Sequence, residues 1–140
     1  MNRPITPGPS GDPPPTAVAS PHGRELDLVT VAAAACLAYD TEFPDERERY
    51  GPAGMQWCRH DNQHVLNWAV ISITGALDFE AQLAWLARIL EHRAFPLDRL
   101  ARSLELLATA LRASYPGEEE VAERIRDGAA FISSRPSFIA

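Results

Sequence analysis

The sequence predicts an all-α protein, an antiparallel helical bundle of about five helices that follows a disordered N-terminal tail. Two observations carry this prediction: apolar residues recur three and four positions apart in segments separated by proline and glycine, and no segment shows the alternation of a strand. The chain has 140 residues, of which 46% are hydrophobic and 23% charged, as in a globular protein. One domain with a single core is therefore expected.

Residues 1–23 are predicted to be a disordered, proline-rich tail. They contain seven of the twelve prolines, with glycines and serines between them. Proline has no backbone donor, and the segment has too little apolar mass to build a core. A docking peptide for an aromatic groove is the alternative for this tail. The helical domain is expected over residues 24–140.

The first helix is predicted over residues 24–39, where Leu26, Val29, Ala33 and Leu37 fall on one stripe. A polar connection, residues 40–53, follows it. Within the connection Pro44 can begin a charged helical turn, residues 45–49, and Gly51-Pro52 ends it. We expect this charged turn to be a solvated face.

Four further helices are predicted, each separated from the next by a breaker. The second covers residues 54–74, the third 78–94 with Asp78 as its N-terminal cap, and the fourth 97–114. The fifth begins with Glu118, Glu119 and Glu120, whose negative charge suits a helix N-terminus. Short connections favour antiparallel neighbours, and a globin-like arrangement fits the same periodicities.

The second helix carries the candidate functional residues. At about 100° per residue, Trp57, Asp61, His64 and Trp68 share one stripe, while Leu66 and Val70 face nearly the opposite way. A helix that is apolar on two sides is a central helix, so Asp61 and His64 should be partly buried between two tryptophans. They can line a ligand pocket with aromatic walls, or form a satisfied structural network that fixes the helix register.

Catalytic and metal chemistry find weaker support in the same helix. His60 and His64 are four apart, but the glutamate of an HExxH zinc site is absent. A metal-dependent hydrolase built on His60, Asp61 and His64 is the third and weakest hypothesis, and no metal ligands are assigned. Cys36 and Cys58 are expected to be small buried residues rather than a nucleophile or a disulfide framework, which favours a reducing, cytoplasmic setting.

Charge and hydropathy exclude two classes of partner. The net charge is -6 and the pI about 5.1, so the surface repels a nucleic acid backbone. No window approaches 18 uninterrupted apolar residues, and the N-terminus lacks the apolar stretch of a secretory signal. We therefore expect neither nucleic acid nor membrane as a partner.

The order of motifs resembles a helical module that accompanies cobalamin-binding domains in bacterial multidomain regulators. The resemblance covers roughly residues 24–139 and rests on sparse motifs, namely Glu48-Arg49-Tyr50-Gly51-Pro52, Cys58-Arg59-His60-Asp61, His64, Trp85, Arg93-Ala94-Phe95-Pro96 and Pro136-Ser137-Phe138. It implies a bacterial regulatory module without catalytic activity. The cobalamin signature Asp-x-His-x-x-Gly is absent, so no cofactor is predicted from it.

Residues 55–95 are also similar to part of a phycobiliprotein, a globin-like helical family. Cys58 lies three residues before Asp61, the spacing at which that family attaches a bilin to the cysteine and contacts its pyrrole nitrogens through the aspartate. The family's arginine before the aspartate is replaced by His60. This similarity implies a tetrapyrrole ligand with Cys58 as its attachment point.

Two main hypotheses of function follow from the sequence. The first is a non-enzymatic helical regulatory or interaction module that binds a protein partner or forms a homodimer through its first or fourth helix. The second is a small-molecule sensor whose pocket is lined by Trp57, Cys58, Asp61, His64 and Trp68.

Overall fold

The computed structural model describes residues 13–139, which form five α-helices and one two-stranded antiparallel sheet. The helices are α1 (Leu28–Glu42), α2 (Glu46–Ile73), α3 (Phe79–His92), α4 (Leu97–Ser114) and α5 (Glu119–Ser133), and the strands are β1 (Ala17–Ala19) and β2 (Glu25–Asp27). The predicted all-α bundle of five helices is confirmed. The predicted disorder of residues 1–12 lies outside the described residues.

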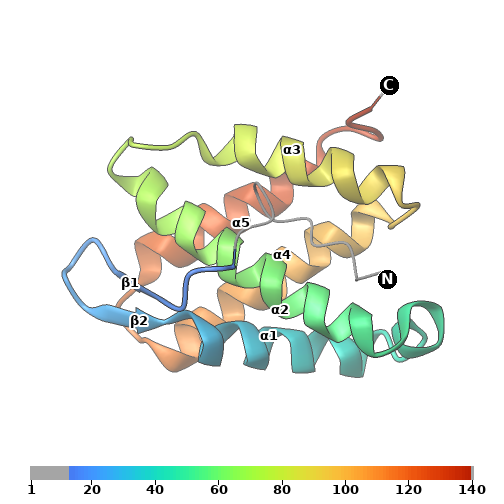
Figure 1. Cartoon of the computed structure of the whole chain (residues 1–140). Coiled ribbons are helices and arrows are strands. Elements are labelled where there is room, and N and C mark those ends of the chain that lie inside the picture. The colour runs from blue at the N-terminus through green and yellow to red at the C-terminus, as the bar shows by residue number, and fades with distance from the viewer. Residues whose placement is uncertain (1–12, 140) are drawn as a thin grey trace.

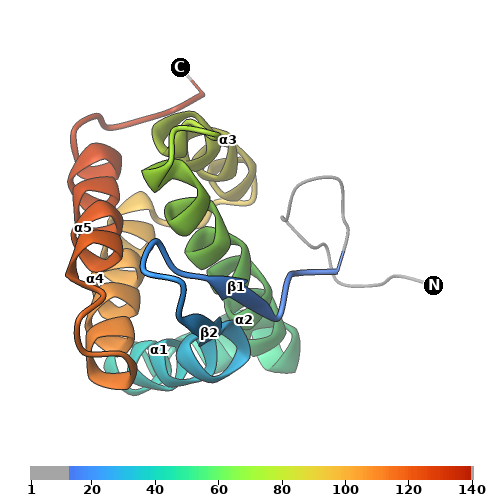
Figure 2. The same cartoon turned by 90° about the vertical axis from the view of Figure 1, so that its left-hand side faces the viewer.

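The helices pack around one core. In Figures 1 and 2, α4 and α5 lie side by side as an antiparallel pair behind α2, with α1 below and α3 above. The leucine seam predicted for α4 is buried at Leu100, Leu104, Leu107 and Leu111. Within the described residues, no helix is long and apolar enough to cross a membrane.

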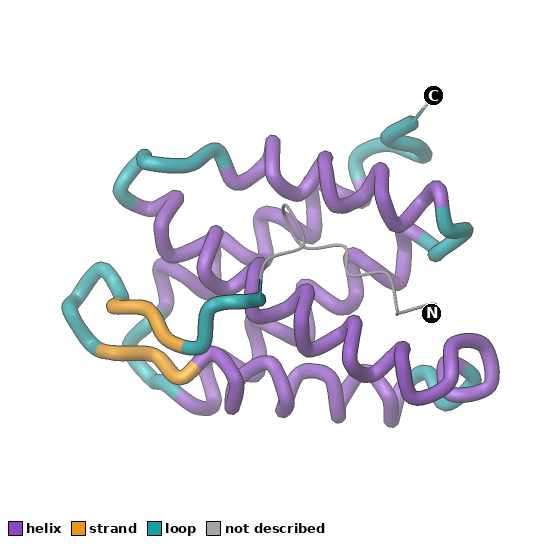
Figure 3. The backbone as a smooth tube through the Cα atoms, in the orientation of Figure 1, coloured by secondary structure: helices purple, strands orange, loops and turns teal. Residues whose placement is uncertain are grey.

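The sheet is a departure from the sequence prediction, which expected disorder to residue 23 and no strand. Figure 3 shows the hairpin in orange at the start of the described chain. Val18 pairs with Leu26, and Leu26 is fully buried, so the hairpin is fastened to the core. The connecting turn is stabilised by Ser20, whose Oγ accepts hydrogen bonds from the backbone N–H groups of His22 and Arg24. Serine hydroxyls commonly stabilise turns in this way.

Arg24 joins the hairpin to the connection between α4 and α5. Its Nε donates to Glu118 Oε2 at 3.2 Å, and its Nη2 donates to the carbonyl of Pro116 at 2.6 Å. Glu118 is 2% exposed and lies at the N-terminus of α5, where the sequence predicted negative charge, and its carboxylate also forms an ion pair. Its partner, Arg24, was predicted to begin the first helix and lies instead in the turn before β2.

Helix α1 buries a different face from the one that the sequence indicated. Its buried side includes Val31, Ala35 and Tyr39, whereas Val29 and Leu37 are 43% and 63% exposed. Helix α1 is apolar on nearly every side, so its periodicity does not distinguish an inner from an outer face. The helix also begins later than predicted, at Leu28, with Asp27 as its N-terminal cap.

Helix α2 is bent near its start. Gly51 has φ 64° and ψ -160°, a left-handed conformation that glycine adopts readily, and Pro52 begins the segment that follows. The predicted break at Gly51-Pro52 is therefore real, although the charged turn before it runs on into the helix without a loop. The bend turns residues 46–50 back towards α1 and opens the space between the two helices.

Candidate ligand-binding site

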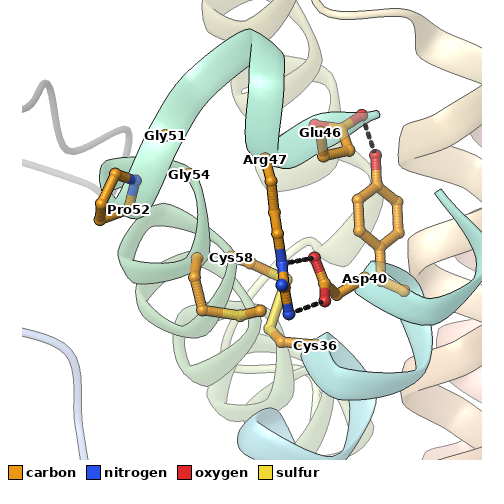
Figure 4. Close-up of a pocket in the computed structure, with 10 residues that line it drawn as sticks. Cys36, Asp40, Glu46, Arg47, Gly51, Pro52, Gly54 and Cys58 are labelled. Atoms are coloured by element: carbon orange, nitrogen blue, oxygen red, sulfur yellow. Dashed lines mark hydrogen bonds and ion pairs between the residues drawn. A yellow bond between two sulfur atoms is a disulfide. The ribbon is translucent and has the colours of Figure 1, made fainter. Parts of the chain in front are cut away.

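The bend in α2 and the C-terminal half of α1 enclose a pocket of about 350 Å³. Figure 4 shows a close-up of this pocket, with the bent segment of α2 above it. Its walls combine apolar, charged and sulfur-containing side chains: Cys36, Tyr39, Asp40, Glu46, Arg47, Gly51, Pro52, Gly54, Met55 and Cys58. This volume lies near the lower end of the roughly 300–1,000 Å³ that small-molecule sites occupy.

Two polar contacts hold the bent segment against α1. Arg47 forms a two-pronged ion pair with Asp40, through Nε to Oδ1 at 3.2 Å and Nη2 to Oδ2 at 2.8 Å. The Tyr39 hydroxyl donates to Glu46 at 2.9 Å. Burial and this contact with a carboxylate both raise the pKa of Tyr39 above its ordinary value. Both contacts cross from one wall of the pocket to the other, so they fix its width (Figure 4).

The prediction that the charged turn is exposed to solvent is wrong for one of its residues, Glu46. The Glu46 side chain is 12% exposed and pairs with Arg99 of α4 in addition to Tyr39. The guanidinium of Arg99 also stacks 4.4 Å from the centre of the Phe43 ring. The turn is therefore tied to α1 and α4 together, and residues 46–50 become a wall of the site.

Cys36 and Cys58 form a disulfide between α1 and α2, which corrects the expectation that they remain separate small residues. No pattern in the sequence indicates this bond, because the two cysteines lie 22 residues apart in different helices. The Cys58 sulfur is bonded to Cys36, so it is not free to attach a bilin, as the phycobiliprotein similarity implied.

An inner cavity of about 70 Å³ lies behind the pocket and shares Tyr39, Glu46, Gly54 and Cys58 with it as walls. Trp57 and Asp61 from α2 line the cavity, with leucines and Phe95 from the surrounding helices. The indole Nε1 of Trp57 is buried, and no described residue accepts its hydrogen. A buried donor without an acceptor costs about 1–3 kcal/mol, so a carbonyl or other acceptor in the cavity would be favoured.

Asp61 is one of the titratable groups that line the inner cavity, together with Glu46 and Tyr39. Burial raises its pKa to about 6, and a contact with His60 Nδ1 at 3.3 Å and the charge of Arg93 oppose that rise. The Asp61 side chain is 16% exposed. Near neutral pH this carboxylate can accept a hydrogen bond from a ligand, and below pH about 6 it becomes a neutral acid.

The predicted site residues separate into two groups. Trp57, Cys58 and Asp61 lie together at the pocket and its inner cavity. His64 and Trp68 are buried further along α2, 6% and 3% exposed, and line neither space. The His64 ring lies between those of His60 and Trp68, with centroids 4.8 and 5.9 Å away. The predicted burial of His64 is thus confirmed, in a row of rings that meet at angles of 63° and 34° rather than in a pocket.

Sequence reasoning missed the contribution of α1 to the site. Tyr39 and Asp40 were assigned to the end of the first helix and the start of a polar connection, with no role. The available signal was the opposite charge of Asp40 and Arg47, seven residues apart on either side of Pro44. Among the described residues, no group of three or more His, Cys, Asp and Glu side chains is close enough to hold a metal ion.

Comparison of the chain with protein-family models, curated proteins and solved structures finds no significant match. The resemblance to the cobalamin-associated module and the similarity to phycobiliproteins therefore stay predictions.

The disulfide should be a major source of stability. Replacing both cysteines, Cys36→Ala with Cys58→Ala, should lower the free energy of unfolding by about 3 kcal/mol, because the unfolded chain regains the freedom of a loop of this length. Urea unfolding followed by circular dichroism measures the change, and Cys58→Ala alone should have nearly the same effect. An unchanged midpoint would show that the bond is absent in solution.

The raised pKa of Asp61 predicts a specific pH dependence. The pKa in the folded protein, about 6, exceeds the ordinary value of 3.8, so the folded protein holds this proton more tightly than the unfolded chain. The stabilisation is complete below pH about 4 and is lost as the pH rises through about 6. Between those limits the free energy of unfolding of the wild type should fall by up to about 3 kcal/mol relative to that of Asp61→Asn. If the difference in unfolding free energy between the wild type and Asp61→Asn were the same at every pH, the titration of Asp61 would not be its cause.

Proposed function

We propose that this protein is a non-enzymatic helical module that binds a small, mainly apolar molecule in the pocket between α1 and α2. The observation that carries the proposal is the inner cavity, whose mainly apolar lining includes Trp57, with an unpaired donor at Nε1, and Asp61, whereas the other carboxylate in its lining, Glu46, is paired with Arg99. Sites for small molecules combine apolar walls with a few fixed polar groups in this way. Of the residues that the sensor hypothesis placed in the pocket, Trp57, Cys58 and Asp61 belong to the proposed site. Tyr39 and Glu46 join them.

The two polar groups define the ligand's chemistry. Trp57 Nε1 requires an acceptor, and the Asp61 carboxylate accepts from a donor. A planar aromatic amide presents both, a carbonyl oxygen and an N–H group, on an apolar ring. Tetrapyrroles fit less well, because the inner cavity is about 70 Å³ and the Cys58 sulfur is bonded to Cys36.

Benzamide is the probe that tests this site. In a ¹H–¹⁵N NMR titration, the Trp57 indole N–H signal should shift, with a Kd on the order of 1 mM for a fragment of this size. Trp57→Phe keeps an aromatic ring without the donor and should weaken binding about tenfold, as should Asp61→Asn.

Trp85→Phe is the matched control, because Trp85 packs against the core outside the pocket and the cavity. It should remove its own indole signal and leave benzamide binding unchanged. Shifts that appear elsewhere in the protein, or equal binding by the Trp57 and Trp85 variants, would contradict the proposed site.

A second candidate function is self-association through α1, and a separate observation favours it. The exposed face of α1 carries Val29, Ala34, Leu37 and Ala38, and the only charged residue between Leu28 and Thr41 is Asp40, which is 9% exposed. An uncharged helix face of this kind suits contact with a second copy of the chain. The homodimer through the first helix predicted from the sequence would use this face.

Leu37→Glu tests the dimer. A charge at this position should cost binding free energy in an apolar interface and shift the protein towards the monomer in sedimentation velocity experiments. Ala130→Glu places the same charge on an exposed position of α5 and should leave the mass unchanged. A wild type that sediments as a monomer at every concentration would exclude this candidate.

A further inference from the structure

We propose that the Cys36–Cys58 disulfide is a thiol-exchange site, at which a low-molecular-weight thiol enters the pocket and attacks Cys58. This inference goes beyond ligand binding and does not depend on it, since it requires only that the pocket admits a small thiol. It rests on three features of the structure: the access to the bond, the different burial of its two cysteines, and a buried amide that contacts both sulfurs.

Access to the disulfide comes from the pocket. Cys36 and Cys58 both line it, so the bond is part of the pocket wall rather than of the closed core (Figure 4). Cys36 is 1% exposed, whereas Cys58 is half-buried. Thiol–disulfide exchange requires the attacking thiolate to reach a sulfur atom, and here the reachable sulfur is that of Cys58.

The leaving group is prepared by Asn62. Its Nδ2 lies 3.3 Å from each sulfur and donates to the Cys58 carbonyl at 2.9 Å. Asn62 is 4% exposed, so this amide is fixed in place. When the bond breaks, the amide can donate to the thiolate that forms on Cys36. Hydrogen bonds to a charged sulfur favour the thiolate, which makes it a better leaving group.

The charges around the pocket leave the approach of an anion open. Its two carboxylates, Asp40 and Glu46, are each paired with an arginine, Arg47 and Arg99 respectively. Met55 and Pro52 complete the wall with apolar surface. A thiolate that enters therefore meets balanced charges rather than unpaired carboxylates.

The exchange is balanced without any other reagent. The thiolate RS⁻ forms a bond to Cys58 Sγ, the Cys36–Cys58 bond breaks, and its electron pair leaves on Cys36 Sγ as a thiolate. A second RS⁻ can attack the sulfur of the R group, which releases RSSR and a Cys58 thiolate. Two thiols are then oxidised by two electrons in total, and the protein disulfide is reduced by two. In the reverse direction, Cys36 attacks the mixed disulfide and expels RS⁻.

The experiment measures which cysteine reacts in the folded protein. Full-length Cys36→Ser and Cys58→Ser each keep one thiol, and each is incubated with oxidised glutathione, followed by acid quenching and mass spectrometry. The thiol of Cys58 should take up glutathione at least about tenfold faster than that of Cys36, because reactivity follows access. In concentrated urea the two variants should react at similar rates, which separates the effect of the fold from that of local sequence.

A second variant tests the role of Asn62 with the disulfide intact. Reduced glutathione should open the bond of Asn62→Leu about tenfold more slowly than that of the wild type, because the Cys36 thiolate loses its donor. For the single-cysteine variants, the proposal would be overturned if the thiol of Cys36 in the folded protein took up glutathione as fast as that of Cys58, or faster. It would also be overturned by a wild-type disulfide that opens only at the rate of global unfolding, because the disulfide would then be a structural bond alone.

Discussion

The covalent bond between α1 and α2 is the constraint on which the pocket depends. It holds the two helices at a fixed distance where Gly51 turns the start of α2 away from its axis. If the distance between α1 and α2 were not fixed at this point, residues 46–50 before the bend would have no defined position opposite α1. The Arg47–Asp40 and Tyr39–Glu46 contacts then set the width of the space that the bond and the bend create.

The polar contacts around this site matter because they are partly or wholly withdrawn from water. Exposed ion pairs contribute little to stability, but Glu46 and Asp40 are largely covered, and each needs a partner to offset the loss of hydration. Asp61 is the exception, since its partner is a histidine at 3.3 Å and burial dominates its pKa. The bundle thus keeps one carboxyl group whose charge changes close to neutral pH, at the wall of its inner cavity.

The sequence predicted the helices well wherever apolar and polar residues alternate around the axis. The predicted fourth helix, residues 97–114, has the bounds of α4, and Asp78 caps α3 as expected. In α1 the same reasoning failed, because an alanine-rich helix gives the periodicity no contrast, and the exposed face was taken for the buried one. The prediction also placed Trp57 and Asp61 together, because residues four apart share a helix face.

The rest of the site depends on contacts between distant segments, which a helical wheel does not contain. The partners of Cys58, Glu46 and Asn62 lie on another helix, and single-sequence patterns carry no pairing signal for them. The hairpin was missed for a related reason. Its local composition favours disorder, and contacts with distant segments hold it in place, among them the burial of Leu26 and the pairing of Arg24 with Glu118.

That last pairing sets the practical boundary of the folding unit. A fragment that starts after Arg24 would look complete by its helices, yet it would leave the carboxylate of Glu118 inside the protein without its cation. Removing the partner of a buried charge is more damaging than removing both members of the pair, because the remaining charge has nothing to offset its loss of hydration. Expression fragments for this domain should therefore keep the hairpin, or replace Glu118 by a neutral residue when the hairpin is cut away.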